Sequence, residues 1–172
     1  MSFERFEAAI VSPALKAVAR HWNEARGARK MPGWSDIKPS AIAAYLPIVW
    51  AYKYDHATDT FTGRLAGDRV TSIFGAANIR GLAMSEGFPA DQYPVVFARS
   101  KRIITEPALM RGSGLAFRHL DRYGTGERIM MPLAEDGEHG DGIFGATEYR
   151  LDYTTAQDLV GTAEVVEWFA LD

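Results

Sequence analysis

Four histidines are the residues best suited to metal or acid–base chemistry, and they lie far apart along the chain. They are His21, His56, His119 and His139, and no two of them are three or four residues apart. Because two ligands on one helix face need that spacing, the histidines predict no helical metal site. A lone histidine can also ligate haem, and His21 and His119 are the candidates, although surface and capping histidines are commoner.

His119 and Asp121 are two residues apart, a spacing that could orient a catalytic base. In an extended strand both side chains would lie on one face and could form a hydrogen-bonded dyad. No serine or cysteine nucleophile stands beside them, so we interpret the pair as structural. The acidic residues between 134 and 142 are interspersed with glycines, and we assign them to a solvated hairpin tip rather than to paired acid–base work.

Large apolar side chains at regular spacings point to a different kind of site, a pocket for a small molecule. Trp50 and Tyr52 would share one face of a strand, and other aromatic or methionine side chains would reach the same space from neighbouring elements. The predicted lining is Trp50, Tyr52, Phe74, Phe97, Phe117 and Met130. The simpler alternative is that these side chains fill a dry core, since they pack equally well in either case.

A hairpin must position the first of these side chains. Residues 47–54 are rich in β-branched and aromatic residues, residues 55–59 suit a turn, and residues 60–66 form a second short run. Residues 70–74 then place apolar side chains at helical spacing, which predicts a short helix.

The second half of the chain predicts one helix followed by strands. Residues 91–105 have an apolar face, and we interpret Arg99, Lys101 and Arg102 as its solvated face rather than an anion site, because no glycine-rich phosphate loop precedes them. Three strands are expected over residues 106–120, 128–134 and 143–149, with turns at 121–126 and 136–142. Residues 157–171 are compatible with a helix or a strand.

The N-terminal part predicts helices and a connector. Residues 3–10 have near-helical apolar spacing, and Ser12 is expected to cap a second helix that ends at Gly27. The apolar stripe of that helix either packs on its own domain or pairs with its copy in a homodimer. Asp36 lies in a connector rich in proline and glycine, where a turn or cap is a commoner role than a functional carboxylate.

Composition limits the function classes. The chain has 172 residues, a formal net charge of −3, a pI near 5.8 and no cysteine. The charge argues against a general nucleic-acid or anionic-membrane binder. The lack of cysteine excludes disulfides, thiolate metal sites, thiol nucleophiles and cysteine-adduct photochemistry. No apolar run reaches the roughly 20 residues of a transmembrane helix, so we expect a cytoplasmic protein.

The predicted order is helix, two strands, several short helices and three strands, which indicates an α+β fold with a five-stranded antiparallel sheet of order 2-1-5-4-3. This order resembles a PAS domain, specifically the single-domain PAS-type family widespread in α-proteobacteria (the PAS_5 group). The motifs that carry the resemblance are His21-Trp22, Met31-Pro32, residues 35–39, residues 45–47, residues 64–67, Phe74-Gly75, Arg80-Gly81 and residues 128–133. Trp34 departs from the pattern, because the resemblance predicts a basic residue there, and this argues against a salt bridge in the connector.

The resemblance implies a bacterial sensor or interaction fold, in which a PAS-like core covers residues 47–153. An N-terminal helical segment (1–27), an extended connector (28–46) and a C-terminal segment packed on the core (154–172) complete the expected organisation. We expect a non-enzymatic domain for signal transduction that binds a small ligand, a protein partner or both, without nucleic acid or membrane. No effector module fits in the chain, so a signal would leave through a surface contact, such as a homodimer through the N-terminal helix. The cofactor is unknown.

Two alternatives come from other classes. A small α+β enzyme would use a carboxylate or His119 as general base in an apolar pocket. A pure protein-interaction scaffold would have no cavity and would expose an apolar face on residues 3–22.

Overall fold

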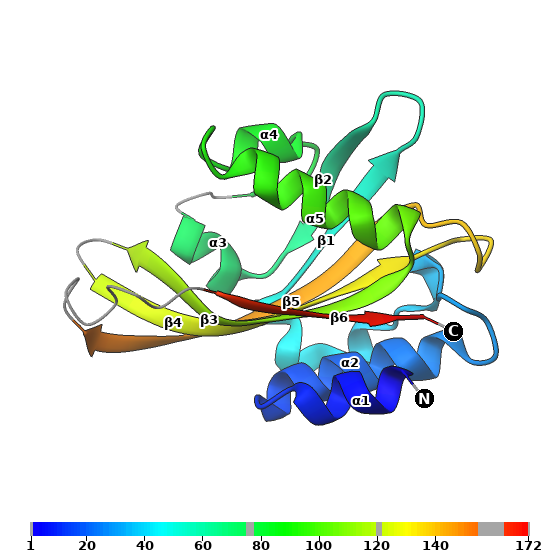
Figure 1. Ribbon diagram of the computed structural model, residues 1–172, viewed down its shortest axis with the longest axis horizontal. Coiled ribbons are helices and arrows are strands. Elements are labelled where there is room, and N and C mark those ends of the chain that lie inside the picture. The colour runs from blue at the N-terminus through cyan, green and yellow to red at the C-terminus, as the bar shows by residue number, and fades with distance from the viewer. Residues whose placement is uncertain (1, 75–77, 120–121, 155–163, 172) are drawn as a thin grey trace.

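The computed structural model describes residues 2–74, 78–119, 122–154 and 164–171, and its architecture is an antiparallel sheet with helices on both faces (Figure 1). The helices are α1 (Ser2–Ala9), α2 (Pro13–Arg26), the 3-10 helices η1 (Trp34–Asp36) and η2 (Pro39–Ile48), α3 (Asp68–Phe74), α4 (Met84–Gly87) and α5 (Tyr93–Thr105). The strands are β1 (Val49–Asp55), β2 (Thr60–Ala66), β3 (Ala108–His119), β4 (Arg122–Leu133), β5 (Gly142–Thr154) and β6 (Val165–Ala170). Among the described residues, no helix combines the length and apolarity needed to cross a membrane.

The sheet order is β2-β1-β5-β4-β3-β6. The α+β class and the order of the first five strands are therefore confirmed, and the sheet has a sixth strand that the sequence left open. Strand β6 pairs antiparallel with β3 from Val165↔Ser113 to Ala170↔Ala108. Its sequence fits a helix or a strand, and the long open edge of β3 decides in favour of the strand.

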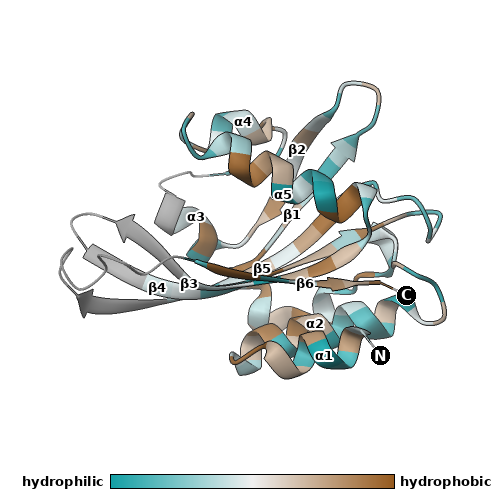
Figure 2. Cartoon of the chain, in the orientation of Figure 1, coloured by the Kyte–Doolittle hydropathy of each residue, from teal (hydrophilic) through white to brown (hydrophobic). Residues whose placement is uncertain are grey.

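Strand alternation divides the side chains between two cores. Val49 and Ala51 face the core under α1 and α2, whereas Trp50 and Tyr52 face the core under α3, α4 and α5. Figure 2 shows apolar residues on the helix faces turned toward the sheet on either side. Segments 49–52 of β1, 129–133 of β4 and 142–147 of β5 are thus buried on both faces, which is why they contain few polar residues.

Glu127 fixes the helical layer to the sheet. Its carboxylate accepts hydrogen bonds from the backbone N–H of Val11 at 2.9 Å and of Ser12 at 2.8 Å. Arg111 donates to the same carboxylate at 2.6 Å and also binds Glu167 of β6 at 2.6 Å. The junction between α1 and α2 is therefore tied through β4 and β3 to the sheet edge.

The predicted cap and the connector are explained by local contacts. The Ser12 hydroxyl accepts a hydrogen bond from the Leu15 N–H, so the predicted N-cap is confirmed. Asp36 accepts from the Gly33 N–H at 2.8 Å, as its predicted capping role requires. Arg29 also pairs with Asp36 at 2.5 Å, so the connector does contain a salt bridge, from a residue other than position 34. The Arg29 hydrogen bond and the Gly33 N–H lower the pKa of Asp36.

Two predicted boundaries are wrong. Residues 47 and 48 belong to η2 rather than to the first strand. Residues 122–126, predicted as a turn, lie in β4 and pair with β3 or β5. A Cβ at Gly126 would lie 2.8 Å from the carbonyl oxygen of Glu148, so this glycine permits a close approach between strands rather than a turn.

Adjacent residues at the end of α1 test this packing. Ile10 is 1% exposed in the core, whereas Val11 is 73% exposed. We expect Ile10→Ala to lower the free energy of unfolding by about 2–5 kcal/mol, because it leaves a cavity. Val11→Ala keeps the backbone hydrogen bond to Glu127 and should change the free energy of unfolding by less than about 0.5 kcal/mol. Urea denaturation measures both, and equal effects would contradict the assigned burial.

Candidate ligand-binding pocket

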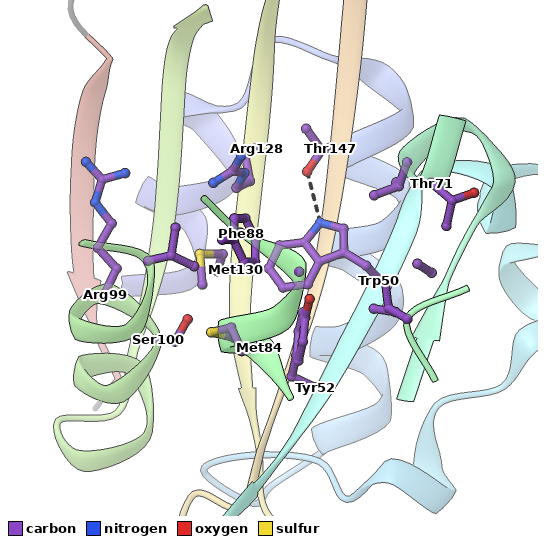
Figure 3. A pocket seen from close by; sticks show the side chains of 15 residues that line it. Trp50, Tyr52, Thr71, Met84, Phe88, Arg99, Ser100, Arg128, Met130 and Thr147 are labelled. Carbon is purple, nitrogen blue, oxygen red and sulfur yellow. Dashed lines mark hydrogen bonds between the residues drawn. The ribbon is translucent and has the colours of Figure 1, made fainter. Parts of the chain in front are cut away.

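A partly enclosed pocket lies between the sheet and helices α3, α4 and α5. Its walls come from β1, β2, β4 and β5 below and from the three helices above, and they are mostly apolar (Figure 3). The pocket leaves about 60 Å³ for the centres of water-sized molecules. One water needs roughly 10–15 Å³ on this measure, so the space exceeds a single hydration site.

Three of the six predicted lining residues meet in this pocket: Trp50, Tyr52 and Met130. Phe97 packs instead against Phe61, with ring centroids 5.8 Å apart. On α5 the pocket-facing positions are 96, 99 and 100, and residue 97 is turned about 100° from position 96. The side chains of Phe74 and Phe117 lie outside the described part of the chain.

The Trp50 indole is held by contacts to β5. Its Nε1–H donates to the Thr147 hydroxyl at 2.9 Å (Figure 3). Its ring covers Gly145, where a Cβ would come within 2.3 Å of the indole, so any larger residue would displace the ring. Trp50 and Gly145 are register partners on neighbouring strands. The backbone of β5 therefore forms the surface against which the indole packs.

A polar chain extends from Trp50 to Arg128. Thr147 also hydrogen-bonds with the Tyr149 side chain, which in turn hydrogen-bonds with Arg128. Arg128 and Thr147 are register partners on β4 and β5. Burial raises the pKa of Tyr149, so its hydroxyl is neutral at physiological pH.

Two hydroxyl groups of the lining could contact a bound molecule. Ser100 on α5 is 1% exposed, and its Oγ has no hydrogen-bond partner among the described residues. Tyr52 on β1 is 7% exposed and lines the same pocket. Burial raises the pKa of Tyr52 to about 12, so the phenol remains a neutral donor. Buried polar groups usually find a partner, so the Ser100 hydroxyl is suited to a bound molecule.

Arg99 differs from its predicted role on a solvated helix face. It lines the pocket and pairs with Glu164, with Nη1 and Oε2 2.5 Å apart. Lys101, on the same helix, does face outward and pairs with Asp59 at 2.7 Å. No local pattern points to this role of Arg99, because Glu164 is distant in the chain. Arg128 was also missed, although it lies two residues before Met130 and so shares its strand face.

The histidines lie away from this pocket where the structure describes them. His21 accepts a hydrogen bond from the Lys38 N–H at 2.9 Å, and burial lowers its pKa, which identifies it as a neutral capping residue. His139 and Asp136 form an exposed pair in the hairpin tip. The side chain of His119 and residue Asp121 lie outside the described residues. In the described part of the chain, no three His, Asp or Glu residues cluster as metal ligands.

Comparison with known proteins adds a family match. A family model described as PAS domain matches residues 10–148. Searches of curated proteins and of solved structures give no match. The matched region contains β1, β2, β3, β4 and the helices that cover the pocket.

Thr147→Val tests the hydrogen bond that holds the Trp50 indole. We expect it to lower the free energy of unfolding by about 1–3 kcal/mol, because the isosteric change leaves the buried indole N–H without its acceptor. Thr71→Val is the control, since that hydroxyl lies in an exposed bond to the Asp68 carbonyl and its loss should cost less than about 0.5 kcal/mol. Urea denaturation monitored by tryptophan fluorescence measures both. Similar costs would contradict the assigned role of Thr147.

Proposed function

Since the chain belongs to the PAS domain family, we propose that it is a sensory or regulatory domain that binds a small ligand between the sheet and helices α3, α4 and α5. One observation carries the ligand-binding part: the Ser100 hydroxyl, on the wall of the cavity, is buried and has no hydrogen-bond partner among the described residues. A dry core would have an apolar or paired side chain at this position. A cytoplasmic location and a bacterial, α-proteobacterial source belong to the same proposal and rest on the resemblance.

The proposed output begins at Arg99. This residue lines the pocket on α5 and binds Glu164, which directly precedes the edge strand β6. A ligand that moves α5 would change this ion pair and with it the start of β6. The changed edge would then alter the affinity for a protein partner or a second copy of the chain.

The two alternative functions receive less support. A scaffold without a cavity would expose apolar residues between positions 3 and 22, but Phe6, Leu15 and Trp22 are fully buried on the sheet. The apolar stripe of α2 therefore covers its own domain, and a homodimer through this segment would use its outer, polar face. For the enzyme, the described lining residues include no carboxylate or histidine to act as general base.

Native mass spectrometry of freshly purified protein tests ligand binding. We expect a non-covalent mass in the native spectrum that is lost on denaturation. Ala66→Leu should reduce this occupancy at least about tenfold, because the added atoms enter the pocket beside Trp50. Ala8→Leu makes the same change on an exposed face of α1 and should retain the ligand. An added mass that persists in Ala66→Leu would place the molecule elsewhere. A wild-type protein without added mass, and without a saturable fluorescence change across a metabolite library, would contradict ligand binding.

Arg99→Met tests the link to β6. We expect faster amide hydrogen exchange in residues 165–170, because Glu164 loses its partner and the strand loses an anchor. Lys101→Met is the control on the same helix, since that residue pairs with Asp59 in the turn between β1 and β2, away from β6. Unchanged hydrogen exchange in β6 would contradict the proposed coupling between the pocket and this strand.

A further inference from the structure

The charge of the pocket lining is not balanced. Arg99 and Arg128 are the cationic residues among the described lining residues, and Arg99 is paired with Glu164. Arg128 hydrogen-bonds with Tyr149, a neutral phenol, and forms no ion pair with any described carboxylate. Glu164, whose Oε1 has no hydrogen-bond partner among the described residues, lies beside Gly112, the register partner of Arg128. Two guanidinium groups and one carboxylate therefore meet on this side of the pocket, and an anion would offset the excess positive charge.

The neighbouring acidic residue does not supply that charge. Glu127 precedes Arg128 on β4, and strand alternation directs it to the opposite face, where it binds Arg111 and the junction of α1 and α2. Glu148 follows Thr147 on β5 and hydrogen-bonds with Ser12 on that same opposite face. The pleat thus places Glu127 and Glu148 under α1 and α2, on the face opposite to Arg128, and Glu164 is the carboxylate paired with the pocket lining.

The hydroxyl groups of the lining suit an acceptor group. The Ser100 hydroxyl has no partner among the described residues, and Tyr52 lines the same space. Each can donate one hydrogen bond, and the raised pKa of Tyr52 keeps its proton in place. A carboxylate accepts about four hydrogen bonds and pairs with a guanidinium through both oxygens. Figure 3 shows the three donors on separate elements, β4, α5 and β1, around the apolar side chains of the lining.

The size of the pocket limits the rest of the ligand. Its volume of about 60 Å³ is below the roughly 150 Å³ of an engineered cavity that holds benzene. Trp50, Met84 and Met130 provide apolar walls against which a short hydrocarbon tail would pack. An acid with a few carbon atoms fits these limits.

We propose that the pocket binds a small monocarboxylate with a short apolar tail, whose carboxylate pairs with Arg128 and whose tail packs against Trp50 and Met130. This inference rests on the proposed function and specifies the chemical class of its ligand. Ser100 and Tyr52 provide the remaining hydrogen-bond donors. The carboxylate of Glu164 neutralises one of the two guanidinium groups, so a ligand with one unit of negative charge balances the other.

Isothermal titration calorimetry of the dialysed full chain tests the inference. The probes are propionate, butyrate and 3-methylbutanoate, each compared with its neutral amide at millimolar concentration. We expect at least one acid to bind about tenfold or more tightly than its amide, since an ionised partner strengthens the hydrogen bonds to Arg128. Arg128→Met should weaken that acid about tenfold or more and should leave its amide unchanged.

Arg5→Met is the matched control, because it removes the same charge from the exposed side of α1 on the other face of the sheet. It should preserve the affinity for the acid within about twofold. Arg128→Met also loses its bond with Tyr149, so its unfolding midpoint is measured in parallel. Ser100→Ala gives a second readout, because the Ser100 hydroxyl has no hydrogen-bond partner among the described residues. It should weaken the affinity for the acid about threefold to tenfold and leave the fold intact.

The outcomes separate this inference from the proposed function. If an amide binds as tightly as its acid and Arg128→Met has no effect, the carboxylate class is wrong and ligand binding in the pocket stands. If no probe binds while the native spectrum shows another mass that Ala66→Leu removes, the class is again wrong and the proposed function stands. If no probe binds and no added mass or fluorescence change is found, both fail.

Discussion

The constraint on which the structure depends is the alternation of side chains along an antiparallel sheet that is covered on both faces. Because successive residues point to opposite faces, each central strand supplies one core under α1 and α2 and another under α3, α4 and α5. Trp50 and Ala51 show the division on β1, and Met130 and Met131 show it on β4. A shift of one residue would exchange the two cores, so this register also fixes which charged residues reach the pocket.

The two faces use their polar groups differently. Under α1 and α2, the carboxylate of Glu127 joins Arg111 and two backbone N–H groups, and Trp22 donates to the carbonyl of Pro132. Polar groups there are paired and hold helices to the sheet. Under α5, the buried hydroxyl of Ser100 has no described partner and lines a cavity. This difference between the two faces supports the proposal that a ligand binds on the second one.

The candidate site could be predicted in part. Trp50, Tyr52 and Met130 followed from strand alternation within apolar runs, and the same rule would have included Arg128, two residues before Met130. Phe97 lies outside the lining because it packs against Phe61, whereas its neighbour Val96 on α5 faces the pocket. Arg99 was misassigned to solvent because its partner, Glu164, lies 65 residues away and pairs with it only in the folded chain. Long-range ion pairs leave no local pattern in a sequence.

The sequence by itself determined the α+β class, the Ser12 cap, the hairpin of β1 and β2, and the order of the first five strands, since each follows from local periodicity, capping or chain connectivity. Only the tertiary structure decided that residues 165–170 form a strand, because the edge of β3 supplies the hydrogen bonds that a helix would otherwise make internally. The tertiary structure also decided that Gly126 belongs to a strand. A glycine is needed there because the backbone of β5 approaches it closely. The excess positive charge of Arg99, Arg128 and Glu164 belongs to this second group, because charge balance depends on which groups meet in space.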